Sequence, residues 1–162
     1  METSLPQLLR DETVARLEQD FADLWRALQA AVTLGAADRA GHSAKSLAAY
    51  LAARDRLAIS ALEDLEHGRR PVLAGIRDEG LRAMAPFATI ELPADAVLRW
   101  FRSVHEALME RLRATAPELW REPLLPDGRS LPQLLGADDA GPTLYAAVAA
   151  EVRAIVSRTA GD

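Results

Sequence analysis

Cysteine is absent from the 162-residue sequence, and this absence removes several kinds of site at once. The chain can form no disulfide, offers no thiolate to a metal and has no cysteine nucleophile. A sequence without cysteine also fits a reducing compartment, so we expect the protein to be cytoplasmic.

Two further absences concern membranes and nucleic acids. No apolar run approaches the roughly 20 residues that a bilayer-spanning helix needs, and the N-terminal METSLPQLLRDE does not resemble a signal peptide. The formal charge is −5 at pH 7, and no cluster of Lys and Arg with aromatic residues stands out. We therefore expect neither a membrane nor a nucleic acid as a partner.

Motifs of familiar enzyme classes are also missing. The sequence has no Gly-rich phosphate loop, no nucleophile elbow and no HExxH motif. Histidine occurs only at His42, His67 and His105, and the first two lie beside the expected ends of a helix. Metal binding needs converging ligands, so these three histidines predict no metal site by themselves.

Alanine and leucine are abundant, while Val, Ile, Tyr and Phe are sparse, a balance that favours helix over strand. Apolar residues recur at spacings of three and four in four stretches, which predicts amphipathic helices over residues 5–31, 43–66, 94–114 and 130–158. We therefore expect a single all-α domain, residues 1–162, built as a four-helix bundle.

The ends of these helices carry recognisable signals. SLPQ at residues 4–7 is a capping box, and the hexamer SLPQLL returns at residues 130–135, where we expect the same capping device. Gly141 and Pro142 should break or kink the last helix and leave residues 143–156 regular. Residues 33–41 form a connector with a glycine near each end.

A long passage separates the second and third helices. Residues 71–93 contain Gly75, Gly80, Pro86 and Pro93, and we expect a short helix near 76–84 and a brief extended piece at FATIE, residues 87–91. The passage is long enough to cross over the bundle, so an up-down-up-down order is not assured. Long connections are often functional, which makes this one a candidate lid or wall.

Several segments carry a family resemblance. Residues 42–56, HSAKSLAAYLAARDR, resemble the W-S-V-K-D-hydrophobic-L-A-H-L-x-x-W-E-R segment of the DinB/YfiT-like superfamily, and residues 144–156, LYAAVAAEVRAIV, are similar to its H-Y-x-E-H-A-x-x-I-R-A-W-L ending. Residues 94–120 look like its third helix and residues 124–135 like the approach to its fourth. The layout most resembles the ClbS/DfsB-like branch and extends over nearly the whole chain.

The resemblance implies a four-helix bundle with a long crossover, commonly dimeric, and we expect a homodimer. Many members of the superfamily bind a metal through three histidines, whose positions fall here on Tyr50, Leu144 and Val148. Leucine and valine cannot ligate a metal, so we expect the metal site to be lost and no cofactor to be bound. Two aromatic positions of the pattern fall on His42 and Arg54. ClbS-like proteins act on reactive electrophilic natural products, which implies a resistance role.

Candidate site residues lie on or beside the apolar stripes. His105 lies inside a helix next to Phe101 and Leu108, and it is either a buried histidine with one hydrogen bond or a general base lining a pocket. Tyr50 and Tyr145 are either core tyrosines with satisfied hydroxyls or a hydrogen-bonding pair in one central cavity.

Charged residues near the stripes complete the candidate set. Arg54 shares the face of Tyr50 and either extends to solvent at the bundle edge or points inward, where it requires an acidic partner that Glu151 or Glu106 could supply. Asp55 and Arg56 are expected to be surface charges. The candidate ligand-binding residues are thus Tyr50, Arg54, Tyr145 and Glu151, with His105 as the candidate catalytic base.

Three hypotheses for function follow. The first is a metal-free bundle with a small-molecule pocket that binds, sequesters or hydrolyses an apolar or electrophilic metabolite. The second is a non-catalytic dimeric structural or interaction module; Trp100 and Phe101 are adjacent and cannot share one helix face, so one of them would cover a partner subunit or the 71–93 passage. The third is a metal enzyme with ligands that the pattern does not reveal.

Overall fold

The computed structural model describes residues 4–35, 43–121 and 124–161, and its regular elements in this part of the chain are all helical. The α-helices are α1 (Leu5–Leu34), α2 (Ala44–Glu66), α3 (Asp78–Ala88), α4 (Ala94–Ala114), α5 (Leu131–Leu135) and α6 (Leu144–Ala160). Two 3₁₀ helices, η1 (Val72–Gly75) and η2 (Pro117–Trp120), lie in the connections. The all-α prediction is thus confirmed, whereas His42 and most of the 33–41 connector lie outside the described residues.

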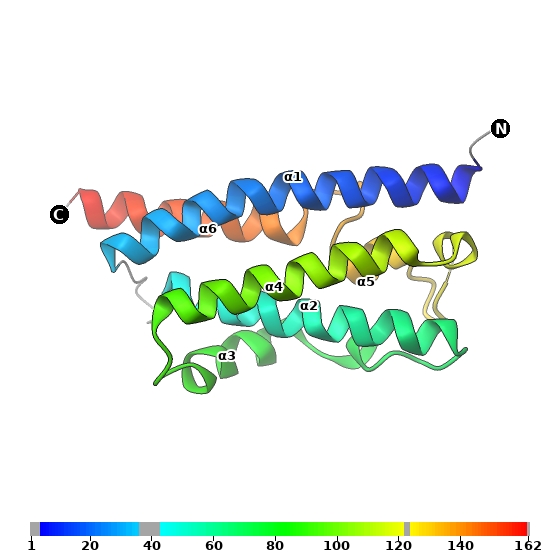
Figure 1. The fold of residues 1–162 in the computed structure, drawn as a ribbon, viewed down its shortest axis with the longest axis horizontal. Coiled ribbons are helices and arrows are strands. Elements are labelled where there is room, and N and C mark those ends of the chain that lie inside the picture. The colour runs from blue at the N-terminus through cyan, green and yellow to red at the C-terminus, as the bar shows by residue number, and fades with distance from the viewer. Residues whose placement is uncertain (1–3, 36–42, 122–123, 162) are drawn as a thin grey trace.

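The four long helices are arranged as two pairs (Figure 1). α1 lies beside α6, α2 lies beside α4, and the shorter α3 covers the outer side of α2. Figure 1 shows that α2 and α4 run in the same direction, because the chain returns along the molecule between residues 67 and 93. The connection after α2 is therefore a crossover and not a tight hairpin.

Both capping boxes form as the sequence predicts. The Ser4 hydroxyl accepts a hydrogen bond from the Gln7 backbone N–H, and the Gln7 side chain accepts one from the Ser4 N–H. Ser130 and Gln133 repeat the arrangement at the start of α5. Each box satisfies two backbone donors that a helix N-terminus otherwise leaves without partners.

The last predicted helix is divided earlier than expected. α5 ends at Leu135, followed by the C-cap Gly136, whose φ of 69° lies in the left-handed region, and α6 begins only at Leu144 after Thr143 caps it. The break therefore starts five residues before Gly141. Arg16 on α1 holds the intervening loop by donating to the carbonyl oxygens of Asp138 (2.9 Å) and Gly141 (2.6 Å).

The prediction of an extended piece at residues 87–91 is wrong. α3 continues through Pro86 to Ala88, and a turn follows. Pro86 lies in the last turn of the helix, so the backbone hydrogen bond that its missing N–H removes belongs to the end of α3. The Thr89 hydroxyl donates to the Ala85 carbonyl oxygen (2.9 Å), which satisfies one acceptor at this helix end.

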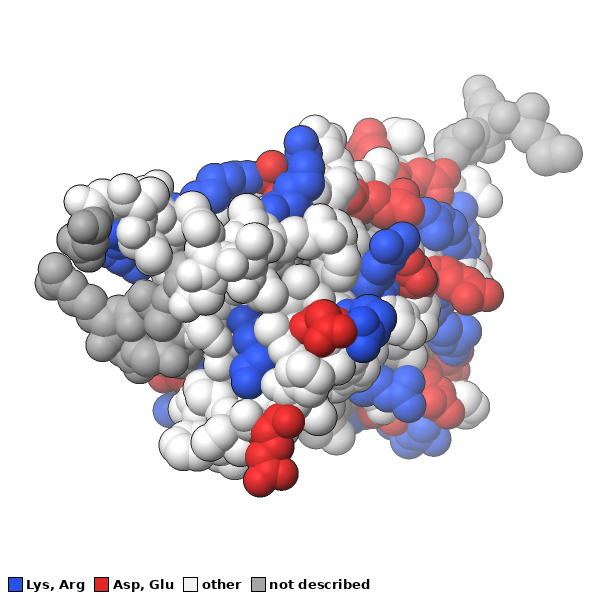
Figure 2. Space-filling view, turned by 60° about the vertical axis from the view of Figure 1, so that its left-hand side comes forward, with Lys and Arg blue, Asp and Glu red and all other residues white. Residues whose placement is uncertain are grey.

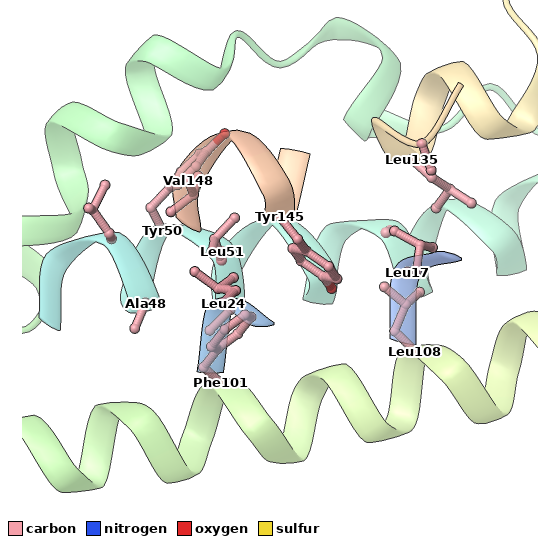
Figure 3. Packing of buried hydrophobic residues seen from close by; sticks show 14 of the residues in the cluster. Leu17, Leu24, Ala48, Tyr50, Leu51, Phe101, Leu108, Leu135, Tyr145 and Val148 are labelled. Atoms are coloured by element: carbon pink, nitrogen blue, oxygen red, sulfur yellow. The ribbon is translucent and has the colours of Figure 1, made fainter. Parts of the chain in front are cut away.

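The core lies between the two helix pairs, and Figure 3 shows its central part. Leu24, Leu51 and Phe101 are completely buried there, and they come from α1, α2 and α4. Within the described residues, no helix has the length and apolar character needed to cross a bilayer. Burial of this apolar surface is the main favourable term in folding.

Candidate functional site

Three polar side chains from three helices form a hydrogen-bonded chain inside the protein. The Tyr145 hydroxyl on α6 donates to Oδ2 of Asp55 on α2 at 2.6 Å. Nδ1 of His105 on α4 lies 3.0 Å from the same hydroxyl. All three side chains are buried, with 3% of Asp55 and 4% of His105 exposed. We call Asp55, Tyr145 and His105 the polar chain.

Aromatic rings fix the position of the histidine. The Phe21 ring on α1 stacks on the imidazole of His105 with the ring centroids 3.6 Å apart and the planes 1° from parallel. Tyr145 and Phe101 also contact Phe21 edge to face. Since the stacked ring and the bond to Tyr145 both restrain the imidazole, its free nitrogen Nε2 has one defined direction.

Burial shifts the pKa values of the polar chain in opposite directions. Desolvation raises the pKa of Asp55 to about 7, although the bond from Tyr145 and the charge of Arg54 oppose this shift. Desolvation, with a smaller contribution from the Arg113 charge, lowers the pKa of His105 to about 4. Burial also raises the pKa of Tyr145 well above its ordinary value. At neutral pH the imidazole and the phenol are therefore uncharged.

The polar chain ends at an open cleft between α1 and α4. The cleft has a volume of about 510 Å³. Its walls are Glu18, Phe21, Ala22, Trp25, Arg26, Arg102, His105 and Glu106. Nε2 of His105 makes no hydrogen bond to another residue in the part of the chain described, and it is the ring atom available to a molecule in the cleft.

The cleft combines aromatic walls with a charged rim. Phe21 and Trp25 stack with their centroids 5.8 Å apart, and the Arg102 guanidinium lies 5.8 Å from the Trp25 ring. Arg102 also donates to Glu106 at 2.9 Å. An apolar or aromatic group fits such walls, while the rim offers both signs of charge to a polar substituent.

A second polar cluster lies on the other side of α2, against α3. Arg54 pairs there with Asp78 at 3.1 Å, and Arg82 forms an ion pair with Glu151 on α6. The Arg82 guanidinium also lies 5.3 Å from the Tyr50 ring. The structure thus brings Tyr50, Arg54 and Glu151 together through α3, but away from the cleft that His105 lines.

Arg54 is buried, and its partners differ from those expected. Its guanidinium donates to the carbonyl oxygens of Leu134 and Leu135, both at 3.1 Å, and to Asp78. Neither Glu151 nor Glu106 is its partner, because these carboxylates pair with other arginines. Asp78 was not among the candidate partners, because it belongs to the crossover passage, whose position relative to α2 has no local sequence signal. Arg54 therefore holds the C-terminal end of α5.

The two tyrosine hydroxyls do not meet in a common cavity. Figure 3 shows the rings of Tyr50 and Tyr145 extending in opposite directions. Tyr145 reaches Asp55, whereas Tyr50 lies under Arg82. Burial, together with the nearby Asp78 charge, raises the pKa of Tyr50 to about 12. Each tyrosine therefore belongs to a different polar cluster.

Within the described ranges, no group of three or more His, Asp or Glu side chains is arranged to hold a metal ion. The positions that the resemblance assigns to metal ligands carry Tyr50, Leu144 and Val148, and Val148 is buried in the apolar core. The remaining described histidine, His67, lies at the end of α2, where its Nδ1 is 2.7 Å from the Glu63 carbonyl oxygen.

Asp55 is the site residue that the sequence reasoning assigned to the surface, and the structure corrects this. Asp55 follows Leu51 by four residues and precedes Ala58 by three, so the helical spacing places it in the buried stripe of α2. That periodicity could have identified it. Its partner Tyr145 lies 90 residues further along the chain and is not indicated by any local pattern.

Comparisons with known proteins add no relative. No protein-family model, no curated protein and no solved structure matches this chain.

Proposed function

We propose that this protein binds an apolar, electrophilic small molecule in the cleft between α1 and α4 and hydrolyses it, with His105 as the general base. The observation that carries the proposal is the placement of His105, whose Nδ1 is held by Tyr145 while its ring forms part of an aromatic-walled cleft. A general base needs such a fixed direction toward the proton that it removes.

The chemical step needs no group beyond water and the polar chain. Nε2 of His105 takes a proton from a water molecule as the water oxygen attacks the electrophilic carbon of the bound compound. The bond from that carbon to the leaving group then breaks, and the leaving group is released. Phe21 and Trp25 hold the apolar part of the compound. Arg26 and Arg102 at the rim donate hydrogen bonds to a negatively charged substituent.

We also propose the family assignment that the sequence resemblance implies. The layout supports a DinB-like four-helix bundle of the ClbS/DfsB-like kind, in which the metal ligands have been replaced and acid–base chemistry is left to His105. The biological role would be protection of the cytoplasm against a reactive metabolite. The pairing of the long helices and the crossover after α2 support the bundle assignment.

The proposal is tested with an activated ester, 4-nitrophenyl acetate, as the electrophile at pH 8. His105→Gln should lower the protein-dependent hydrolysis rate about a hundredfold, the scale of general-base catalysis. His67→Gln is the matched control, because His67 lies at a helix end outside the cleft. Equal rates in wild type and His105→Gln, or equal losses in the two variants, would contradict the proposal.

A second candidate function is a homodimeric interaction module, and one observation favours it. Met84, Phe87 and Ile90 follow one another at spacings of three along α3 and its C-terminal turn, and they are 62%, 73% and 72% exposed. Apolar side chains repeated on one face of a helix are typical of surfaces that contact another protein.

A further inference from the structure

The polar chain reaches deeper into the protein than the proposed general base requires. Asp55 lies at its inner end, buried and without an ion pair in the described part of the chain. Its neighbour Arg54 directs its guanidinium to Asp78 and to the end of α5 instead. An unpaired carboxylate is costly to keep charged when it is buried, so Asp55 has a strong tendency to take up a proton.

The chain has two hydrogen-bond arrangements that use the same heavy atoms. With Asp55 ionised, the Tyr145 hydroxyl donates to Asp55, the Nδ1–H of His105 donates to the Tyr145 oxygen, and Nε2 carries a free lone pair. With Asp55 protonated, every donor reverses: the carboxyl donates to Tyr145, Tyr145 donates to Nδ1, and Nε2 carries the proton. The distances of 2.6 Å and 3.0 Å suit both arrangements.

We infer that Asp55 is the final acceptor of the proton that His105 takes up in the cleft, and that Tyr145 relays it. This inference rests on the proposed function of His105. As Nε2 receives a proton, the Nδ1 proton passes to the Tyr145 oxygen and the original Tyr145 proton passes to Asp55. One proton enters and one is stored, so His105 ends neutral and Asp55 ends as a carboxylic acid.

The proton affinities of the two ends support this direction. Burial raises the pKa of Asp55 to about 7 and lowers the pKa of His105 to about 4, so a proton is held more strongly at the inner end. Tyr145 only passes the proton on, because burial raises its pKa well above the ordinary value and disfavours the phenolate. An acceptor with a pKa of about 7 suits base catalysis near neutral pH, whereas an imidazole with a pKa of about 4 is a weak base.

Charged side chains around the polar chain come from three helices. On α2 the charge of the Arg54 guanidinium lowers the pKa of the buried carboxylate and so opposes the effect of burial. On α4 the charge of Arg113 lowers the pKa of the imidazole, and Arg113 forms an ion pair with Glu18 of α1. Arg102 and Glu106 pair with each other at the rim of the cleft. α6 contributes only the uncharged phenol of Tyr145. Within the polar chain, Asp55 is therefore the group that changes charge near neutral pH.

The inference is tested by ¹⁵N NMR of the His105 ring between pH 5 and pH 9. In wild type the proton should be on Nε2 at low pH and on Nδ1 at high pH, with a midpoint near 7, the pKa of Asp55. Tyr145→Phe, which removes only the hydroxyl, should abolish this change, and Asp55→Asn should abolish it too. Tyr50→Phe is the matched control, because Tyr50 is buried but lies outside the polar chain.

The two proposals fail in different ways. A single His105 tautomer throughout this pH range in folded wild type would overturn the relay, even if hydrolysis still depended on His105. A tautomer change that persists unaltered in Tyr145→Phe would also overturn it. Absence of hydrolysis, with the tautomer change present and lost in Tyr145→Phe, would contradict only the proposed function. Circular dichroism of each variant establishes that it is folded.

Discussion

At the scale of single residues, the same burial acts oppositely on a carboxylic acid and on an imidazole. Removing water disfavours the charged form of each, so Asp55 tends to keep a proton and His105 tends to lose one. The hydroxyl of Tyr145 lies between them and can either donate or accept. The three residues can therefore take up one further proton, which converts the carboxylate at the inner end into a neutral acid.

This opposition predicts how stability depends on pH. The pKa of Asp55 is raised to about 7 in the fold. Its contribution to the free energy of unfolding is therefore fully present below pH 4 and is lost as the pH rises toward 7. The pKa of His105 is lowered to about 4, so its contribution is present above pH 6.5 and is lost as the pH falls toward 4. Between about pH 4 and pH 6.5 the two contributions oppose each other.

Variants separate the two contributions. In Asp55→Asn only the histidine contribution remains, so the free energy of unfolding should rise with pH across this window relative to wild type. In His105→Gln only the carboxyl contribution remains, so it should fall with pH relative to wild type. Urea unfolding followed by circular dichroism at pH 4.5, 5.5 and 6.5 measures both slopes. Parallel pH dependence in the two variants would contradict the assignment.

At the scale of elements, α5 shows how a short helix is held in place. Its five residues form too few hydrogen bonds to be stable alone, even with a capping box at the start. Arg54 binds the last carbonyl oxygens, and the Leu144 N–H donates to the Gly136 carbonyl at 2.8 Å. The Gly136 carbonyl thus links the end of α5 to the first residue of α6, the helix that carries Tyr145.

A pair of glycines tests this role. Gly136 and Gly35 both end a helix in the left-handed region, with φ of 69° and 65°. A Cβ at Gly136 would lie 3.2 Å from Leu144 Cβ, whereas one at Gly35 would meet no atom of the described residues within 4 Å. Gly35→Ala should lower the free energy of unfolding by about 1 kcal/mol, the cost of left-handed backbone alone. Gly136→Ala should lower the free energy of unfolding by more than Gly35→Ala does, as measured by chemical denaturation. Equal losses of stability in the two variants would show that packing at Gly136 contributes nothing.

At the scale of the whole molecule, two helix pairs enclose a core that contains one polar chain, and the outside carries an uneven distribution of charge. Figure 2 shows a broad area without Lys, Arg, Asp or Glu on the face where the left-hand end of Figure 1 comes forward. Among the exposed apolar residues on the described surface are Met84, Phe87 and Ile90 of the α3 region. Covering them would remove apolar surface from water.

The dimer hypothesis makes a prediction at this scale. If α3 carries the contact, Phe87→Glu should convert a dimer to a monomer in light scattering across a concentration series. Val72→Glu is the matched control, because Val72 is also exposed, at 65%, but lies on η1. A wild-type monomer at every concentration would contradict the hypothesis, and dissociation by both variants would remove the assignment to α3.

The sequence alone determined the first three long helices and the capping boxes, because helical periodicity and capping depend on residues three or four apart. It did not reveal the break at Gly136 or the extension of α3 to Ala88. Ser4 with Gln7, Ser130 with Gln133 and the stripe through Leu47 and Leu51 are local signals of this kind. His105 and Tyr145 could be nominated from the same stripes. Their contact could not be predicted, nor could the pairing of Arg54 with Asp78.

Tertiary structure decided which polar groups meet. Asp55 and Tyr145 are 90 residues apart, and Arg54 reaches α5 across 80 and 81 residues. Contacts at such separations depend on how the helices pair and on where the crossover returns, and these follow from the packing of the whole core. Burial then set the proton affinities, since the environment of Asp55 exists only once α2, α4 and α6 are packed together.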